Sequence, residues 1–135
     1  MKILVTGGSG YLGGRIVEYL VQRGLSVRVG GRDIFADSES LEGACSDIAA
    51  IVHLAAMNSQ DCAKDPEAAL LVNGLNSLRL LNAAERMGIS KFLYFSTAHV
   101  YGSPLTGKLN EESLPRPTHP YSITHRIAED YVLEA

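Results

Sequence analysis

Gly7, Gly10 and Gly13 are separated by two residues each and lie where an apolar run ends and a helical pattern begins. At such a turn, glycines allow backbone N–H groups to approach a pyrophosphate, and the positive end of the helix favours its negative charge. The strand, the turn and the helix together predict dinucleotide binding rather than a glycine-rich turn without a ligand. No Lys-Ser or Lys-Thr pair follows the glycines, which excludes a nucleoside-triphosphate P-loop. A methyltransferase that binds adenosylmethionine is the remaining competitor on this kind of fold.

The segments around this turn alternate between apolar strands and amphipathic helices. Short apolar runs predict strands over residues 2–6, 25–29, 91–95 and within 48–56. Apolar residues at helical spacing predict helices from Tyr11 to a stop at Gly24, from Asp37 or Ser38 to Cys45, from Pro66 to Met87, and from Pro120 onward. Such alternation predicts a parallel sheet with helices on both faces. We therefore expect an α/β fold with a doubly wound parallel sheet, in a single dinucleotide-binding domain over residues 1–135.

The composition is typical of one globular domain and argues against several other classes of protein. Of the 135 residues, 46% are apolar and 20% are charged, and the net charge of -3 leaves no basic surplus for a nucleic acid partner. No apolar run reaches the roughly 20 residues of a membrane helix, and we expect no signal peptide, no membrane association and a cytoplasmic location. Cys45 and Cys62 belong to no metal-binding pattern, so we expect reduced thiols and no metal site.

Four segments resemble a known family in their order along the chain. Residues 6–13, TGGSGYLG, resemble the T-G-x-x-G-x-x-G signature of extended short-chain dehydrogenases/reductases, the NAD-dependent nucleotide-sugar epimerases and dehydratases. Residues 53–56, HLAA, are similar to the family's H-x-A-A segment, and residues 95–102, FSTAHVYG, to its F-S-[ST]-x-x-V-Y-G segment. The segment that starts at Tyr121 provides the fourth match. The resemblance spans nearly the whole chain and implies a shortened Rossmann-type sheet that lacks the family's C-terminal substrate subdomain.

The resemblance implies an enzyme that uses NAD or NADP to oxidise a sugar carbon of a nucleotide-sugar, leading to epimerisation, dehydration or reduction. It also implies which positions contact the cofactor. Asn73 resembles an Asn of the family's V-N-x-x-G-T segment, with a surface amide as the plain alternative. The implied cofactor-binding residues are Gly7, Gly10, Tyr11, Leu12, Gly13, Arg32, Asp33, Ile34, Leu54, Ala55, Ala56 and Asn73.

The resemblance also implies a catalytic set, in which one residue departs from the family. There a Tyr four residues before a Lys acts as acid and base toward a substrate hydroxyl, and a Ser or Thr hydrogen-bonds the same oxygen. Tyr121 and Thr97 match these positions, but His125 stands in the place of the Lys. Histidine, with a usual pKa of about 6.5, is mostly neutral at pH 7, so we expect weakened rather than absent chemistry. The alternative is that Tyr121 and His125 are ordinary residues at the start of a helix.

The choice between NAD and NADP stays open at this level. An acidic residue that closes the second strand binds the ribose of NAD, whereas a nearby Arg suits the 2′-phosphate of NADP. Gly30 occupies the acidic place and Arg32 follows two residues later. Arg32, Asp33 and Ile34 also resemble the family's G-D-[ILV] segment after its third strand. In that alignment the helix and strand between the second and third strands are deleted.

Family members are about twice this length, and the sequence stops inside an apolar helix. The strand over residues 91–95 is then expected to lack an outer neighbour and to form an open edge. A truncated product, a fragment, a homo-oligomer and a subunit completed by a partner chain all remain open. The main alternative to the enzyme is a catalytically silent dinucleotide-binding module.

Overall fold

A computed structural model describes all 135 residues of the chain, as two compact units. Unit 1 comprises residues 1–56 and 76–95, and unit 2 comprises residues 57–75 and 96–135. Unit 1 contains the sheet, and unit 2 is built from helices and loops.

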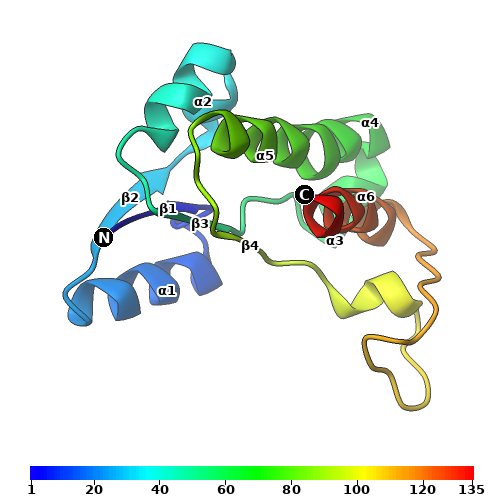
Figure 1. Cartoon of the computed structure of the whole chain (residues 1–135). Coiled ribbons are helices and arrows are strands. Elements are labelled where there is room, and N and C mark those ends of the chain that lie inside the picture. Colours follow the sequence, from blue (N-terminus) through cyan, green and yellow to red (C-terminus); the bar gives the residue numbers. More distant parts are fainter. The chain divides into compact units, whose positions relative to one another are not determined.

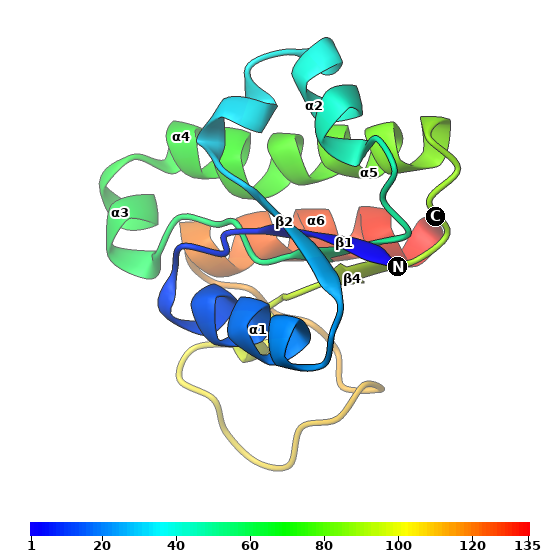
Figure 2. The ribbon, with the colours of Figure 1, turned by 90° about the vertical axis from the view of Figure 1, so that its left-hand side faces the viewer.

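The sheet of unit 1 has four parallel strands in the order β2-β1-β3-β4. Helix α1 covers one face, while α2 and α5 cover the other (Figures 1 and 2). The predicted doubly wound parallel sheet is therefore confirmed. β1 has the predicted bounds, β2 is shifted by one residue, β3 lies within the predicted range, and β4 is two residues shorter than predicted. The bounds are β1 (Lys2–Thr6), β2 (Ser26–Gly30), β3 (Ala50–His53), β4 (Phe92–Tyr94), α1 (Tyr11–Gln22), α2 (Ser38–Cys45) and α5 (Asn76–Arg86).

The strand order supports the deletion of the helix and strand that lie between the family's second and third strands. In the usual doubly wound sheet, the first strand lies between the second and the fourth, and the third lies outside the second. Here β1 lies between β2 and β3, and β2 is itself an edge. The connection from β2 to β3 contains only the 3-10 helix η1 (Arg32–Phe35) and α2. This is the order expected when the usual third strand is absent, and β4 forms the open edge predicted on the other side.

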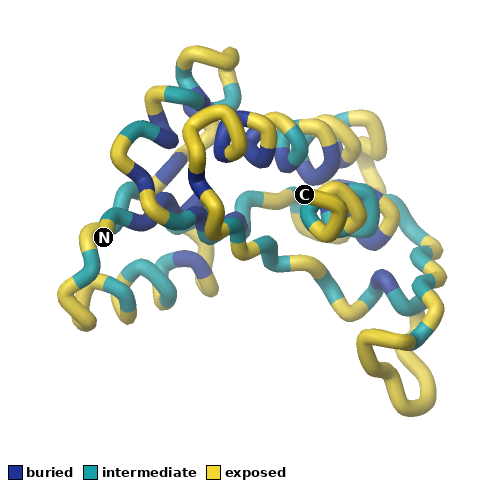
Figure 3. The backbone as a smooth tube through the Cα atoms, in the orientation of Figure 1, coloured by how far each residue is buried: buried dark blue, intermediate teal, exposed yellow.

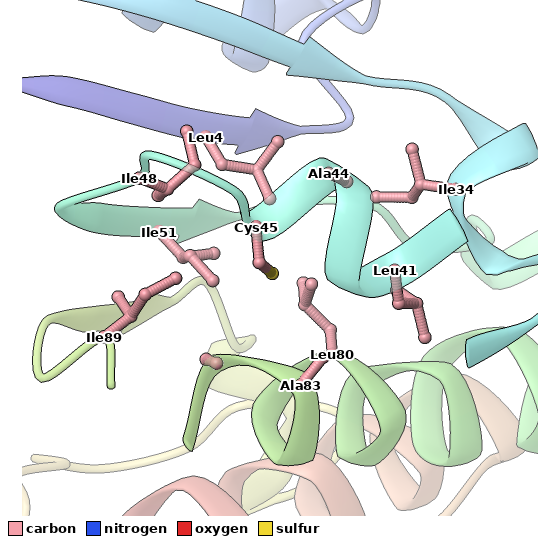
Figure 4. Packing of buried hydrophobic residues seen from close by; sticks show 11 residues of the cluster. Leu4, Ile34, Leu41, Ala44, Cys45, Ile48, Ile51, Leu80, Ala83 and Ile89 are labelled. Atoms are coloured by element: carbon pink, nitrogen blue, oxygen red, sulfur yellow. The ribbon is translucent and has the colours of Figure 1, made fainter. Parts of the chain in front are cut away.

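The core of unit 1 lies between the sheet and the helices α2 and α5 (Figure 4). Leu4 and Ile51 contribute from neighbouring strands, while Leu41 and Leu80 come from the two helices. Burying a side chain of this size contributes about 1.5–3 kcal/mol to the stability of the fold. This layer therefore holds β1 in place, and the end of β1 leads into the glycine turn. The buried cluster consists of Leu4, Ile34, Leu41, Ala44, Cys45, Ile48, Ile51, Leu80, Ala83, Ala84 and Ile89.

The helix expected over residues 66–87 is divided into three parts. Asp65 caps it as predicted, because its carboxylate accepts from the Ala68 N–H at 2.9 Å. Helix α4 (Pro66–Ala69) is followed by a π-helical turn, η2 (Leu70–Leu75), and then by α5. The π-helical turn was not predicted, and neither was the preceding helix α3 (Ser59–Lys64).

Unit 2 is organised around α6 (Pro120–Glu134), which packs against α3, α4, η2 and the 3-10 helix η3 (Ala98–Tyr101). The segment between η3 and α6 is mostly exposed (Figure 3). None of the helices combines the length and the apolar character needed to cross a membrane.

Candidate functional site

Two of the three glycines in the turn are required by the packing of the chain itself. Gly7 has a φ of +71°, and a Cβ added there would lie 2.7 Å from the Ala55 nitrogen. A Cβ on Gly13 would lie 2.1 Å from the Gly7 carbonyl oxygen. Both distances are shorter than any real contact between such atoms, so β1, the turn and α1 approach one another only because these residues are glycines.

Gly10 differs, because a Cβ there would require only a small shift of one neighbouring atom. Its φ of -77° and ψ of 169° form an extended conformation that any residue adopts. A Cβ on Gly10 would meet only the Gly7 carbonyl oxygen, at 3.3 Å. Gly10 therefore leaves an open surface at the start of α1, where a ligand can approach the backbone.

The N-terminus of α1 also lacks a side-chain cap. Gly10 is the N-cap residue, no side chain accepts a hydrogen bond from the first turn, and Tyr11 and Leu12 are 86% and 49% exposed. The N–H groups of a first helical turn have no partner within the helix. Helices α2, α3, α4 and α6 all have a side-chain cap, from Asp37, Asn58, Asp65 and His119 respectively.

A buried hydrogen-bond network fixes the segment beside the turn. The Thr6 hydroxyl oxygen accepts from the Ala55 N–H at 3.3 Å and lies 2.5 Å from His53 Nδ1. On the other side of the ring, His53 Nε2 lies 2.8 Å from the Ser77 hydroxyl oxygen, so both ring nitrogens are hydrogen-bonded within the chain. Leu54 and Ala55, expected to line the cofactor, are thereby held against Gly7.

The end of β2 presents one exposed cation and one exposed carboxylate. Arg32 and Asp33 are exposed, as expected of residues that contact a ligand. Ile34, in contrast, is 8% exposed and belongs to the core, where its Cδ1 lies close to Gly30. Its side chain therefore serves packing.

Asn73 is 1% exposed, so the alternative of a surface amide is wrong. Its Oδ1 accepts from the Met57 N–H at 2.7 Å, and its Nδ2 donates to the Thr124 hydroxyl at 3.0 Å. Thr124 lies on α6 between Tyr121 and His125. Asn73, within the π-helical turn, thus holds the helix that carries the expected catalytic residues.

Tyr121 and His125 lie one turn apart on α6 and contact each other. Their ring centroids are 4.3 Å apart, and His125 Nδ1 lies 2.9 Å from the Tyr121 carbonyl oxygen. A carbonyl only accepts, so Nδ1 carries the hydrogen and donates. His125 is 2% exposed, and this burial lowers its pKa, while the Tyr121 carbonyl and Glu129 act in the opposite direction. The ring is therefore neutral at pH 7.

The neighbouring cation does not replace the family's Lys. Arg126 Nη1 donates to the Glu129 carboxylate at 3.0 Å, and Arg126 Nε donates to Asp130 at 3.0 Å. Both acids lie on the same helix as Arg126. The positive charge of Arg126 is therefore paired with these two carboxylates.

Thr97 caps η3, because its hydroxyl oxygen accepts from the His99 N–H at 3.3 Å. The His99 ring lies 5.7 Å from that of His119, which in turn lies 6.2 Å from that of Tyr121. Thr97 and Tyr121 therefore belong to one compact part of unit 2. The sequence patterns did not identify His99 or His119 as candidate site residues.

The burial of His125 predicts that the chain loses stability in acid. Because the folded state disfavours the charged ring, the unfolded state binds the proton more tightly. The stability that the buried, neutral His125 gives to the folded state is therefore fully present above the usual pKa of 6.5, and it is lost as the pH falls below that value. We expect His125→Asn, which keeps a donor near Tyr121, to lose less stability than the wild type between pH 7.5 and pH 5. Urea unfolding measures both, and equal losses in the two proteins would contradict the prediction.

Comparisons with known proteins agree with this geometry. The model of the NAD dependent epimerase/dehydratase family matches residues 3–135. A UDP-glucose 4-epimerase from Corynebacterium glutamicum is 29% identical, over 98% of this chain and 46% of that protein. The Thermus thermophilus UDP-glucose 4-epimerase in complex with NAD has a TM-score of 0.89 and 31% identity, over 99% of this chain and 50% of that one. RMD from Pseudomonas aeruginosa in complex with NADPH has a TM-score of 0.84 and 30% identity, over 98% of this chain and 48% of that one.

The chain spans about half the length of the relatives it matches. The family model nevertheless covers nearly all of it, including the glycine turn and α6. The strand order and the turn geometry described above agree with that match. The chain belongs to the NAD dependent epimerase/dehydratase family.

Proposed function

We propose that the glycine turn binds the diphosphate of a nicotinamide dinucleotide, and that the protein acts as an oxidoreductase on a nucleotide-sugar. The observation that carries the proposal is the open surface at Gly10 in front of an uncapped helix. The N–H groups of Tyr11, Leu12 and Gly13 would then donate to the diphosphate. The relatives crystallised with NAD or NADPH support this assignment.

We further propose that residues 1–135 function as one dinucleotide-binding domain. The family model matches residues 3–135, which supports this assignment. The cofactor-lining role of Leu54, Ala55 and Ala56 fits the network that holds Ala55 beside Gly7. Asn73 would act by holding α6 rather than by touching the cofactor.

In the proposed reaction, the bound dinucleotide supplies a hydride acceptor for the carbon of a sugar hydroxyl. Tyr121 would take the proton of that hydroxyl, and Thr97 would hydrogen-bond the same oxygen. Lowering the pKa of a Tyr from about 10 to about 7 requires roughly 4 kcal/mol of stabilisation of the phenolate. A neutral His125 supplies less of this than a Lys would, so we expect slow turnover.

A second candidate is a dinucleotide-binding module without catalytic activity. The buried, neutral ring of His125 at the position of the family's Lys favours it. Both candidates share the binding of the dinucleotide and differ in turnover. Incubation with NAD or NADP and UDP- or TDP-sugars separates them, since only the enzyme forms product.

Gly10→Ala tests the shared premise. We expect coenzyme binding to weaken by about tenfold to a hundredfold, because the methyl group would keep the diphosphate from charge-assisted hydrogen bonds with the N–H groups. The fold should persist, since the backbone of Gly10 suits alanine and the added Cβ would require the Gly7 carbonyl oxygen to shift by only a few tenths of an ångström. Isothermal titration calorimetry with NADH and NADPH measures the effect.

Gly43→Ala is the matched control. A Cβ on Gly43 would have nothing within 4 Å, and this residue lies in α2, away from the turn. Its affinity should equal that of the wild type. If Gly10→Ala binds as tightly as Gly43→Ala, the diphosphate lies elsewhere and the proposal is wrong.

A further inference from the structure

The segment that carries Thr97 is tied to α6 by a short hydrogen bond. The Ser96 hydroxyl donates to Glu129 Oε2 at 2.6 Å. A hydroxyl that donates to a carboxylate at this distance makes a charge-assisted bond, which is roughly twice as strong as one between neutral groups. Ser96 directly precedes Thr97, whereas Glu129 lies in the second half of α6, so the bond joins residues 33 positions apart. It therefore holds the Thr97 segment against the helix that carries Tyr121.

The Glu129 carboxylate is itself held by Arg126. Arg126 Nη1 donates to Glu129 Oε1 at 3.0 Å, while Arg126 Nε donates to Asp130 Oδ2 at 3.0 Å. Each carboxylate oxygen of Glu129 thus has a partner, Arg126 for Oε1 and Ser96 for Oε2. The side chains of Arg126 and Glu129 are 28% and 20% exposed, so water screens this pair less than a fully exposed one. The oxygen that meets Ser96 is therefore fixed in direction.

The Thr97 side chain is oriented in a way that leaves its hydroxyl hydrogen available. The hydroxyl oxygen accepts from the His99 N–H at 3.3 Å, which sets the direction of the side chain. Accepting uses a lone pair, so the hydrogen can still be donated to another oxygen. The bond between Ser96 and Glu129 constrains the chain one residue earlier. Thr97 is thereby oriented before a substrate arrives, as is required of a group that must meet one particular oxygen.

Glu129 also acts on His125, which lies one helical turn earlier. Residues four positions apart lie on the same face of a helix. Burial lowers the pKa of His125, and the negative charge of Glu129 opposes that effect. The same carboxylate therefore holds the segment of one expected catalytic residue and acts electrostatically on another.

We propose that Glu129 is a positioning residue of the site, which holds Thr97 in place relative to Tyr121 through the hydroxyl of Ser96. The inference rests on the proposed function, since it assigns Glu129 a role in the same reaction. The competing interpretation is that Glu129 only stabilises α6 through its pair with Arg126. Pairs of this kind on one helix contribute little to stability, so that interpretation predicts small effects of any substitution.

The first test follows the order of Thr97 in the full chain and needs no substrate. NMR relaxation gives the order parameter of the Thr97 backbone amide in the wild type, Ser96→Ala and Glu129→Ala. We expect a rigid value of about 0.85 in the wild type and a fall toward about 0.6 in both variants, since both lose the same hydrogen bond. Glu129→Gln keeps an oxygen that can accept from Ser96, so it should restore most of the order.

The second test measures turnover of UDP- or TDP-sugars. Misplacing a group that acts in the transition state lowers kcat rather than ground-state binding. We expect Ser96→Ala and Glu129→Ala to lower kcat by about tenfold to a hundredfold, with KM and coenzyme affinity within about twofold of the wild type. The double variant should be no slower than Glu129→Ala, because the two substitutions remove one interaction. Glu129→Gln should recover part of the rate.

Asp130→Ala is the matched control. Asp130 follows Glu129 on α6 and pairs with the same Arg126, but it makes no hydrogen bond to Ser96. If the carboxylates only stabilise the helix, Asp130→Ala and Glu129→Ala should behave alike. We expect Asp130→Ala to keep the wild-type order of Thr97 and the wild-type kcat.

The two proposals fail in different ways. If the wild type binds no coenzyme or forms no product, the proposed function is wrong at that step, while the order of Thr97 in the variants still decides the role of Glu129. If Thr97 is as ordered in Glu129→Ala as in Asp130→Ala, the assignment of Glu129 is overturned. A loss of stability or coenzyme affinity without a loss of kcat would overturn it in favour of a purely structural role.

Discussion

Gly13→Ala is expected to destabilise the folded chain by about 3 kcal/mol, at the upper end of what overpacking of a closed site costs. Its Cβ would lie 2.1 Å from the Gly7 carbonyl oxygen and 2.9 Å from the Gly8 Cα. Both neighbours are backbone atoms, so no side-chain rotation relieves the clash. The turn would have to open, and coenzyme binding should fall with stability. Urea unfolding followed by circular dichroism measures the change.

Gly14→Ala gives the matched comparison one residue along the same helix. There the added Cβ would lie 3.6 Å from the Gly8 carbonyl oxygen, an ordinary contact. Alanine is favoured over glycine inside a helix by about 1 kcal/mol, so this variant should be as stable as the wild type or more so. Similar losses in both variants would contradict the close packing of α1 onto the turn.

Tyr121→Phe is expected to lower the turnover of the nucleotide-sugar by about 10²- to 10⁴-fold, the usual contribution of a positioned acid or base. The Tyr121 ring packs against His119 and His125, while its hydroxyl makes no hydrogen bond within the chain. Phenylalanine keeps that packing, so folding and coenzyme affinity should be unchanged. Initial rates at saturating coenzyme measure the effect.

Tyr131→Phe, on the same helix and 48% exposed, is the control and should keep the wild-type rate. If Tyr121→Phe also keeps that rate, the assigned role of Tyr121 is wrong. If the wild type forms no product although it binds coenzyme, the silent module is the correct candidate.

The sequence was sufficient for the sheet and the glycine turn because both depend on local patterns. The apolar run that predicts β1 ends at Thr6, as β1 does, and the stop expected at Gly24 is a residue with a φ of +74°. The cap expected at Asp37 or Ser38 is Asp37, whose carboxylate accepts from the Ser40 N–H. In each of these cases the signal lies within a few residues of the feature it predicts.

The features that were missed depend on contacts between distant residues. Thr6 and His53 are 47 positions apart, and Asn73 and Thr124 are 51 apart, so no spacing rule reveals their hydrogen bonds. The π-helical turn directs Asn73 inward, which a regular helical pattern does not indicate. Helix α3 was missed because its six residues contain no apolar period, and its start is set by the Asn58 side chain.

The burial of His125 could not be predicted either. The sequence showed only that a Lys of the family is replaced, whereas the direction of the pKa shift follows from the packing of α6. The same holds at Gly30, whose burial beside Ile34 Cδ1 the sequence did not indicate.

A crystal structure of the chain with NADPH tests the central claim most directly. The account predicts the diphosphate in front of α1, with its oxygens accepting from the N–H groups of Tyr11 and Leu12. A dinucleotide bound at any other place, or none bound at saturating concentration, would contradict it.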